Sequence, residues 1–124
     1  MKSPKNKGSA GERELAKWLQ RTLNLDEAPK RNLEQTRSGG ADLILPPFMF
    51  EVKRCERLDL DSWWVQITKA TGNESIRVVA FRQNHRPWEF LISANYVGIE
   101  KGYVRLNETV FKKWIKNKFN YFII

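Results

Sequence analysis

The chain has 124 residues, 41% apolar and 29% charged, which is typical of one compact globular domain and excludes both a two-domain protein and a disordered chain. Its 22 lysine and arginine residues exceed its 14 aspartate and glutamate residues, for a formal net charge of +8. This excess favours a polyanionic partner, nucleic acid before membrane, although charge that serves only solubility is the alternative.

Cysteine and histidine are scarce, and no stretch resembles a targeting or membrane segment. Cys55 is the single cysteine, which excludes an internal disulfide, and with His85 as the single histidine a zinc site of cysteine and histidine ligands is excluded too. The basic first residues are not followed by the apolar core of a signal peptide. The longest apolar stretch, Leu43 to Phe50, contains two prolines and is too short to span a bilayer. We therefore expect a soluble, cytoplasmic protein.

Residues 1–8 carry three lysines, Lys7 among them, and predict a flexible basic arm that is either a frayed terminus or a phosphate contact. Ser9 is expected to open a helix, because Ser9-x-x-Glu12 matches a capping box and apolar residues follow at helical spacing: Leu15, Ala16, Leu19 and Leu23. Glu12 extends this apolar stripe, whereas Glu14 falls on a different face. Glu12 either caps the helix or enters a site as a carboxylate, and the pattern alone leaves both open.

A hairpin is the central prediction. Asn24–Lys30 reads as a polar connection and Leu33–Thr36 as a short strand, followed by a glycine pair that permits a tight turn. Leu43–Leu45 and Phe48–Val52 then read as two strands across a pair of prolines, in antiparallel order.

Three ionisable residues are expected at one corner of this hairpin. Side chains alternate along a strand, so Glu51 and Lys53 share a face while Phe50 and Val52 point the other way. Asp42 precedes the first strand. Burying carboxylates and an ammonium among apolar neighbours is costly unless a partner compensates. Because two carboxylates suit Mg²⁺, we expect a divalent metal ion and a scissile phosphate there, with Lys53 orienting water or stabilising the transition state.

A second helix is expected after the hairpin, with Asp61 as its N-cap and Gly72 just beyond its end. One face combines a glutamine with apolar residues, namely Trp63, Gln66, Ile67 and Ala70. Gln66 is therefore either a hydrogen-bonded core residue or a contact to the active site, and we favour the second interpretation.

Two further strands, Ile76–Phe81 and Trp88–Ile92, flank a turn that carries Arg82, Arg86 and His85. We expect His85 to be a solvated loop residue. Asn107 can cap a final helix whose predicted buried face is Val110, Phe111, Trp114 and Ile115, and whose wet face is Lys112, Lys113, Lys116 and Lys118. The lysines are either a solvated face or a DNA contact, and the apolar residues 121–124 either enter the core or form a subunit contact.

Two segments resemble known nucleases. Asp42, eight intervening residues and then Glu51-Val52-Lys53 resembles the motif of the PD-(D/E)xK nuclease superfamily. Residues 7–15, Lys-Gly-Ser-Ala-Gly-Glu-Arg-Glu-Leu, resemble the first helix of the archaeal-type Holliday junction resolvases, which also occur in phages. The resemblance covers residues 7–92 and weakens beyond them. It implies an α/β fold in a single domain, with a central mixed β-sheet flanked by helices, as in restriction endonucleases. It also implies a homodimer, Mg²⁺ or Mn²⁺, and hydrolysis of phosphodiesters in branched DNA at four-way junctions.

The resemblance also implies roles for individual residues. It places Glu12, Asp42, Glu51 and Lys53 in the catalytic set, with the main-chain carbonyl of Val52 as a further metal contact. Glu12 would reach the metal through a water or bind a second metal ion. Gln66 is similar to a helix glutamine near the site in several branches of the superfamily. Positions similar to phosphate contacts are Arg13, Arg37 and Ser38, and further candidates for DNA contact are Lys7, Arg54, Arg82 and Arg86.

Three other functions compete with a junction resolvase. The first is a related nuclease that cuts nicked, flapped or linear DNA, since fold and metal site do not set the substrate. The second is a DNA-binding module without activity, against which the intact acidic pair and lysine argue. The third is an RNA-binding protein that stacks bases on Trp63, Trp64 and Trp88, although tryptophans at such spacing are more typical of a core.

Overall fold

The computed structural model describes residues 4–32, 42–72 and 74–123, and the side chains of 4–8, 122 and 123 lie outside that description. Its helices are α1 (Pro4–Leu23), α3 (Leu60–Ala70), the short 3₁₀ helix η1 (Ala94–Val97) and α4 (Glu108–Ile123). Its strands are β1 (Lys30–Arg31), β2 (Leu43–Leu45), β3 (Phe48–Arg54), β4 (Ile76–Arg82), β5 (Glu89–Ser93) and β6 (Tyr103–Asn107).

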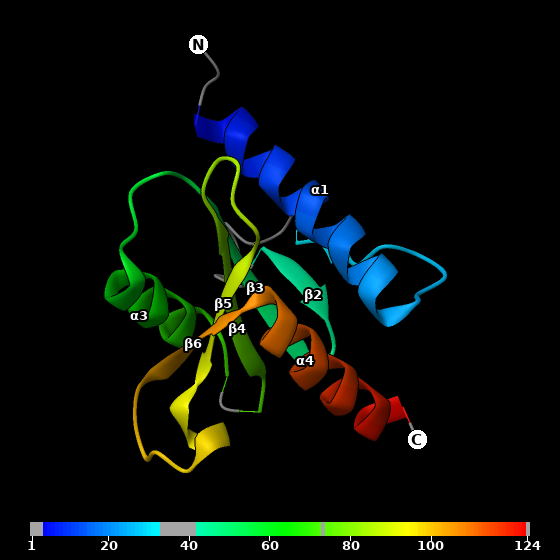
Figure 1. Cartoon of the computed structure of the whole chain (residues 1–124), viewed down its shortest axis with the longest axis vertical. Coiled ribbons are helices and arrows are strands. Elements are labelled where there is room, and N and C mark those ends of the chain that lie inside the picture. The colour runs from blue at the N-terminus through cyan, green and yellow to red at the C-terminus, as the bar shows by residue number, and fades with distance from the viewer. Residues whose placement is uncertain (1–3, 33–41, 73, 124) are drawn as a thin grey trace.

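The six strands form one mixed sheet in the order β1-β2-β3-β4-β5-β6 (Figure 1). The β3–β4 pair is parallel, and the other described pairs are antiparallel, including the predicted β2–β3 hairpin. A parallel pair needs a crossover connection, which α3 supplies between β3 and β4. The prediction of a central mixed sheet flanked by helices is therefore confirmed.

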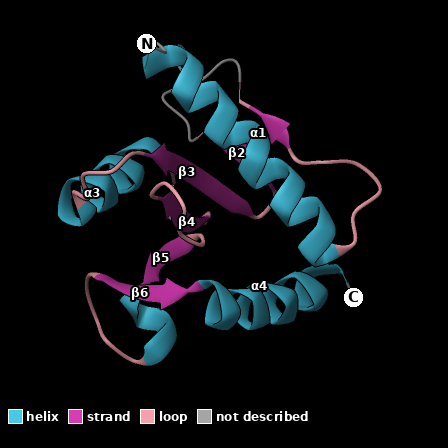
Figure 2. Cartoon of the chain, turned by 45° about the horizontal axis from the view of Figure 1, so that its top comes forward, coloured by secondary structure: helices cyan, strands magenta, loops and turns pink. Residues whose placement is uncertain are grey.

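The helices cover both faces of the sheet: α1 and α4 lie on one face and α3 lies on the other (Figures 1 and 2). Side-chain alternation follows the predicted pattern. Phe50 and Val52 pack in the core beneath α1 and α4, together with Leu15 of α1 and Phe111 of α4. Glu51 and Lys53, one position on, therefore face α3. This alternation brings the predicted charged residues to the side of the sheet where α3 lies.

Helix α4 bears out most of its sequence prediction. The Asn107 side chain accepts a hydrogen bond of 2.8 Å from the Val110 N–H, as an N-cap should. Phe111 and Ile115 are fully buried, and the Phe111 ring stacks on Phe90 with 3.7 Å between centroids. Val110 was wrongly placed on the buried face: it is 46% exposed, because α4 packs through a narrower stripe than the spacing indicated.

Two predicted helix starts are wrong. Helix α1 begins at Pro4 instead of Ser9, so Pro4–Gly8 are helical rather than part of an arm. A proline suits the first helical position, where no intrahelical N–H bond is lost. Asp59, not Asp61, is the N-cap residue of α3, and Asp61 instead accepts a hydrogen bond from the Tyr103 hydroxyl.

Several elements had not been predicted, and one prediction lies outside the described residues. Strands β1 and β6 and helix η1 were not predicted from the sequence. Each of them is short, and β6 lacks a clear alternation of apolar and polar residues. The predicted strand Leu33–Thr36 falls outside the described residues. Within the described residues, none of the helices combines the length and apolar character needed to cross a membrane.

Candidate active site

Asp42 lies where β2 begins, and its carboxylate faces the neighbouring strand. It is 9% exposed, and its Oδ2 accepts a hydrogen bond of 2.8 Å from the Val52 N–H. The Asp42 N–H donates a hydrogen bond to the Phe50 carbonyl at 2.8 Å. The Phe50 carbonyl and the Val52 N–H therefore lie on the same side of β3, the side that faces Asp42. Because the N–H and C=O of one strand residue point to the same side of the strand, the Val52 carbonyl also lies on the side of β3 that faces the Asp42 carboxylate.

Glu51, Lys53 and Gln66 form a connected triad of side chains on the α3 side of the sheet. Glu51 is 5% exposed, and its Oε1 accepts a hydrogen bond of 3.1 Å from Gln66 Nε2. Lys53 Nζ donates to Gln66 Oε1 at 3.0 Å and lies 3.7 Å from Glu51 Oε1. Gln66 thus contacts both charged residues, although it is exposed at the rim of the site and not part of the buried stripe of α3.

The two buried carboxyls perturb each other. The pKa of Glu51 is raised to about 7, mainly by burial and then by the charge of Asp42, and the Lys53 ammonium offsets only part of this rise. Burial also raises the pKa of Asp42, which the Val52 N–H counteracts and the charge of Glu12 reinforces. Asp42 accepts a hydrogen bond from protonated Glu51. The pair therefore carries more negative charge than its surroundings compensate, and it needs either a proton or a cation.

Glu12 lies near this pair but is held by a residue that the sequence had not singled out. Its Oε1 forms an ion pair with Arg31 Nε at 2.7 Å, and Arg31 Nη2 donates to the Ser9 hydroxyl at 3.0 Å. The negative charge of Glu12 raises the pKa of Asp42. Helix α1 therefore brings Glu12 to the edge of the site, while β1 supplies the cation that fixes it.

Helix α1 is docked onto the sheet by Glu14, which pairs with two predicted DNA contacts. Its carboxylate lies 3.4 Å from Arg54 Nε and forms a second ion pair with Arg82. Arg54 also donates to the Arg82 carbonyl at 3.1 Å. Gly11 permits this close approach, since a Cβ there would lie 2.6 Å from Cγ of Arg54. Arg54 and Arg82 are thus engaged within the protein.

The other predicted contacts are distributed unevenly. Arg13 and Arg86 are exposed, as is His85 at the tip of the β4–β5 turn. Arg37 and Ser38 lie outside the described residues, and so does the side chain of Lys7. Among the tryptophans proposed for base stacking, Trp63 and Trp88 are 8% and 2% exposed, so these two belong to the core and do not offer their faces to a ligand.

Arg31, Glu14 and Gly11 were missed by the sequence interpretation. Gly11 lies four residues before Leu15 on the apolar stripe of α1, so a glycine there was a signal of close packing. Glu14, on a different face, carried no such signal. Arg31 carried no comparable signal, because only the pairing of β1 with β2 brings it to Glu12.

The donor set suits a divalent cation, although the described residues do not assemble a complete cage. No group of three or more carboxylate, histidine or cysteine side chains is placed to hold a metal ion among them. Asp42 and Glu51 do offer adjacent oxygens, and the Val52 carbonyl faces the same edge. Mg²⁺ commonly takes one or two carboxylates and keeps several waters, so this arrangement fits it.

Comparison with known proteins supports the fold. No family model and no curated protein matches the chain. Among solved structures, it is similar to Hjc, a Holliday junction resolvase from the archaeal hyperthermophile Archaeoglobus fulgidus. The sequence identity is 22%, the match covers 84% of this chain and 86% of that chain, and the TM-score is 0.50. The likeness is one of fold: the mixed sheet and its flanking helices match the architecture of that nuclease.

Proposed function

We propose that this protein is a metal-dependent endonuclease of branched DNA, and most specifically a Holliday junction resolvase. The observation that carries the proposal is the pairing of two buried carboxyls, Asp42 and Glu51, beside the Lys53 ammonium, where β2 begins next to β3. Similarity of fold to a junction resolvase and the net charge of +8 agree with it.

Asp42, Glu51 and the Val52 carbonyl are the groups that would hold Mg²⁺ or Mn²⁺, with Glu12 acting through a water or at a second ion. Such an ion, when bound, stabilises charge on the phosphoryl group and lowers the pKa of a coordinated water. Binding requires both carboxyls to be ionised, so the affinity for metal should rise as Glu51 loses its proton near pH 7.

Lys53 and Gln66 have separate tasks in this proposal. The Lys53 ammonium, within 3.7 Å of Glu51, either orients the attacking water or stabilises the extra negative charge of the transition state. Gln66 hydrogen-bonds both residues and so fixes the ammonium relative to the carboxylate. It therefore acts as a positioning residue.

The substrate is proposed from the resolvase fold and from the symmetry that a junction requires. A two-fold symmetric homodimer would place two such sites on opposed strands of a four-way junction. Cleavage of four-way junction, flap, nicked duplex and linear duplex should be compared with Mg²⁺, with Ca²⁺ and with chelator. We expect Mg²⁺-dependent cleavage with preference for the junction. A preference for a flap, nick or linear duplex would retain the nuclease and replace the substrate.

Substitution at the site tests the chemistry directly. Glu51→Ala and Lys53→Ala should each abolish cleavage while junction binding survives, because Glu51 would hold the metal ion, Lys53 would act at the reacting phosphate, and neither is needed to hold the DNA backbone. Glu100→Ala and Lys101→Ala are matched controls in an exposed loop, and both should cleave as the parent protein does. Retained Mg²⁺-dependent cleavage in both site variants would discard this site. Tight junction binding without hydrolysis by the parent protein would instead favour an inactive DNA-binding module.

A further inference from the structure

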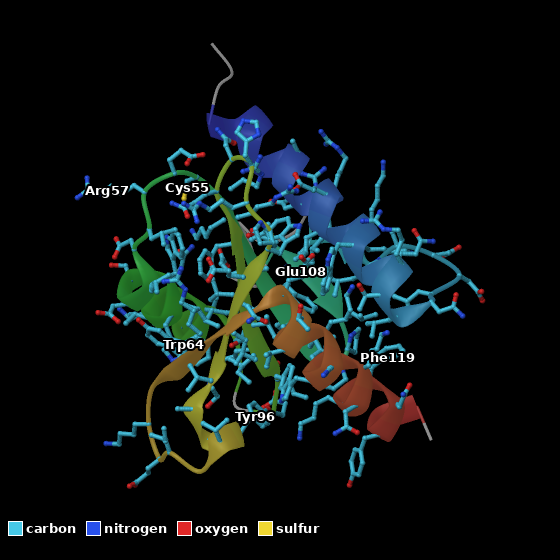
Figure 3. All side chains as sticks on the ribbon, in the orientation of Figure 1. Cys55, Arg57, Trp64, Tyr96, Glu108 and Phe119 are labelled. Atoms are coloured by element: carbon cyan, nitrogen blue, oxygen red, sulfur yellow. The ribbon has the colours of Figure 1, made fainter. Side chains whose placement is uncertain are left out.

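A polar groove separates α1 from α4 on the face of the sheet opposite α3. It encloses about 370 Å³ and is lined by residues of both helices, namely Trp18, Arg21, Thr22, Glu108, Lys112 and Lys116. Figure 3 shows Glu108 in the first turn of α4, where that helix faces α1. Trp18 and Glu108 close one end, because Trp18 Nε1–H donates to Glu108 Oε1 at 2.6 Å across 90 residues of sequence.

The groove concentrates positive charge that the described residues neutralise only in part. Arg21 lines one wall, Lys112 and Lys116 line the other, and none of the three forms an ion pair within the described part of the chain. The one acid in the lining, Glu108, accepts the Trp18 hydrogen bond, and its single negative charge leaves the three basic residues with an excess of two positive charges.

The basic residues of α1 extend the positive charge of this groove along the helix. Arg13, Lys17 and Arg21 follow one another at four-residue spacing and are all exposed, which places them along one side of the helix.

We propose that the groove between α1 and α4 binds the phosphate backbone of a duplex arm of the DNA substrate. This inference rests on the proposed function and adds to it a second contact outside the active site. Two lysines and an arginine supply the charge, and the Thr22 hydroxyl supplies a further hydrogen-bond donor. Lysines that only solvate the surface of α4 would not need to share a groove with an arginine of α1, a helix distant in sequence.

The test compares two doubly substituted variants that each lower the net charge of +8 by two. The groove variant is Lys112→Gln with Lys116→Gln. The control variant is Lys101→Gln with Lys113→Gln, which replaces one exposed lysine of the same helix and one of a distant loop, neither of which lines the groove. Binding to a four-way junction is measured against salt concentration in Ca²⁺ or chelator, so that no DNA is cut, and cleavage is measured separately with Mg²⁺.

The groove variant should reduce the slope of log affinity against log salt by about 2, since each phosphate contact contributes about 0.9. Arg21→Gln, from the opposite wall, should remove about 1 more. The cleavage rate at saturating DNA should be unchanged, because these residues do not touch the scissile phosphate. The affinity of the parent protein should also rise as the junction arms are lengthened, and the groove variant should lack part of that gain.

The outcomes separate the two proposals. If the parent protein cleaves junctions but the groove variant keeps the salt slope and arm-length response of the control variant, the groove inference is overturned and the proposed function stands. If the parent protein neither binds nor cleaves branched DNA, both are overturned.

Discussion

The proton held between Asp42 and Glu51 gives a stability prediction that is independent of any nuclease assay. The perturbation is Glu51→Gln, which has the shape of protonated Glu51 and can still donate to Asp42 and accept from Gln66. In the metal-free protein the pKa of Glu51 rises from 4.5 in the unfolded chain to about 7 in the fold. Between these values the folded state binds more protons than the unfolded state, so the free energy of unfolding must decrease as pH rises.

The magnitude follows from the size of that rise. At about 1.4 kcal/mol per tenfold change in proton affinity, moving the pKa from 4.5 to about 7 costs the folded protein roughly 3 kcal/mol once both states are ionised. The glutamine variant carries no such penalty. It should therefore be more stable than the parent protein by up to roughly 3 kcal/mol above about pH 7, and the difference should vanish below about pH 4.5.

Urea denaturation in the presence of chelator, over this pH range, measures the effect. Asp42→Asn is the informative companion, because it removes the second largest cause of the raised pKa and should flatten the pH dependence in part. Adding Mg²⁺ to the parent protein at high pH should restore stability by mass action, and it should do so less for the glutamine variant. Equal pH slopes for the parent protein and Glu51→Gln would refute the reasoning that burial and Asp42 hold a proton on Glu51.

Two further predictions concern the docking of α1. Gly11→Ala should lower the melting temperature despite a gain of about 1 kcal/mol in helix propensity, because the new Cβ would lie 2.6 Å from Cγ of Arg54. Arg54→Ala should relieve part of that loss in the double variant, and additive effects would contradict the contact. Glu14→Gln should destabilise the protein by about 1 kcal/mol and, by releasing Arg54 and Arg82, strengthen DNA binding at low salt. Unchanged urea midpoints and DNA affinity would contradict this role.

The sequence interpretation was most accurate for features that depend on near neighbours. The β2–β3 hairpin, the shared face of Glu51 and Lys53 and the Asn107 cap were all predicted from spacing within a few residues. It was least accurate where local signals competed. Ser9 resembled a capping residue, yet Pro4 begins the helix, and the Ser9 hydroxyl instead accepts a hydrogen bond from Arg31.

The roles assigned to the site residues remain predictions, and the structure adds their arrangement. Gln66 was weighed as a core residue or a site contact, and it lies at the rim with hydrogen bonds to both Glu51 and Lys53. The engagement of Glu12 by Arg31 was not expected, because Arg31 belongs to a two-residue strand with no alternating pattern to identify it.

By itself, the sequence determined which side chains share a face of a strand or helix, because the periods of two and 3.6 residues are local properties of the backbone. It thereby placed an acidic pair and a lysine at one corner of a sheet. Only the tertiary structure decided that Gln66 bridges Glu51 and Lys53, that Glu14 docks α1, and that α1 and α4 enclose a basic groove. These contacts join residues up to 90 positions apart in the sequence. They depend on the α3 crossover and on how α1 and α4 pack over the sheet, and the local periodicity of the sequence does not specify either.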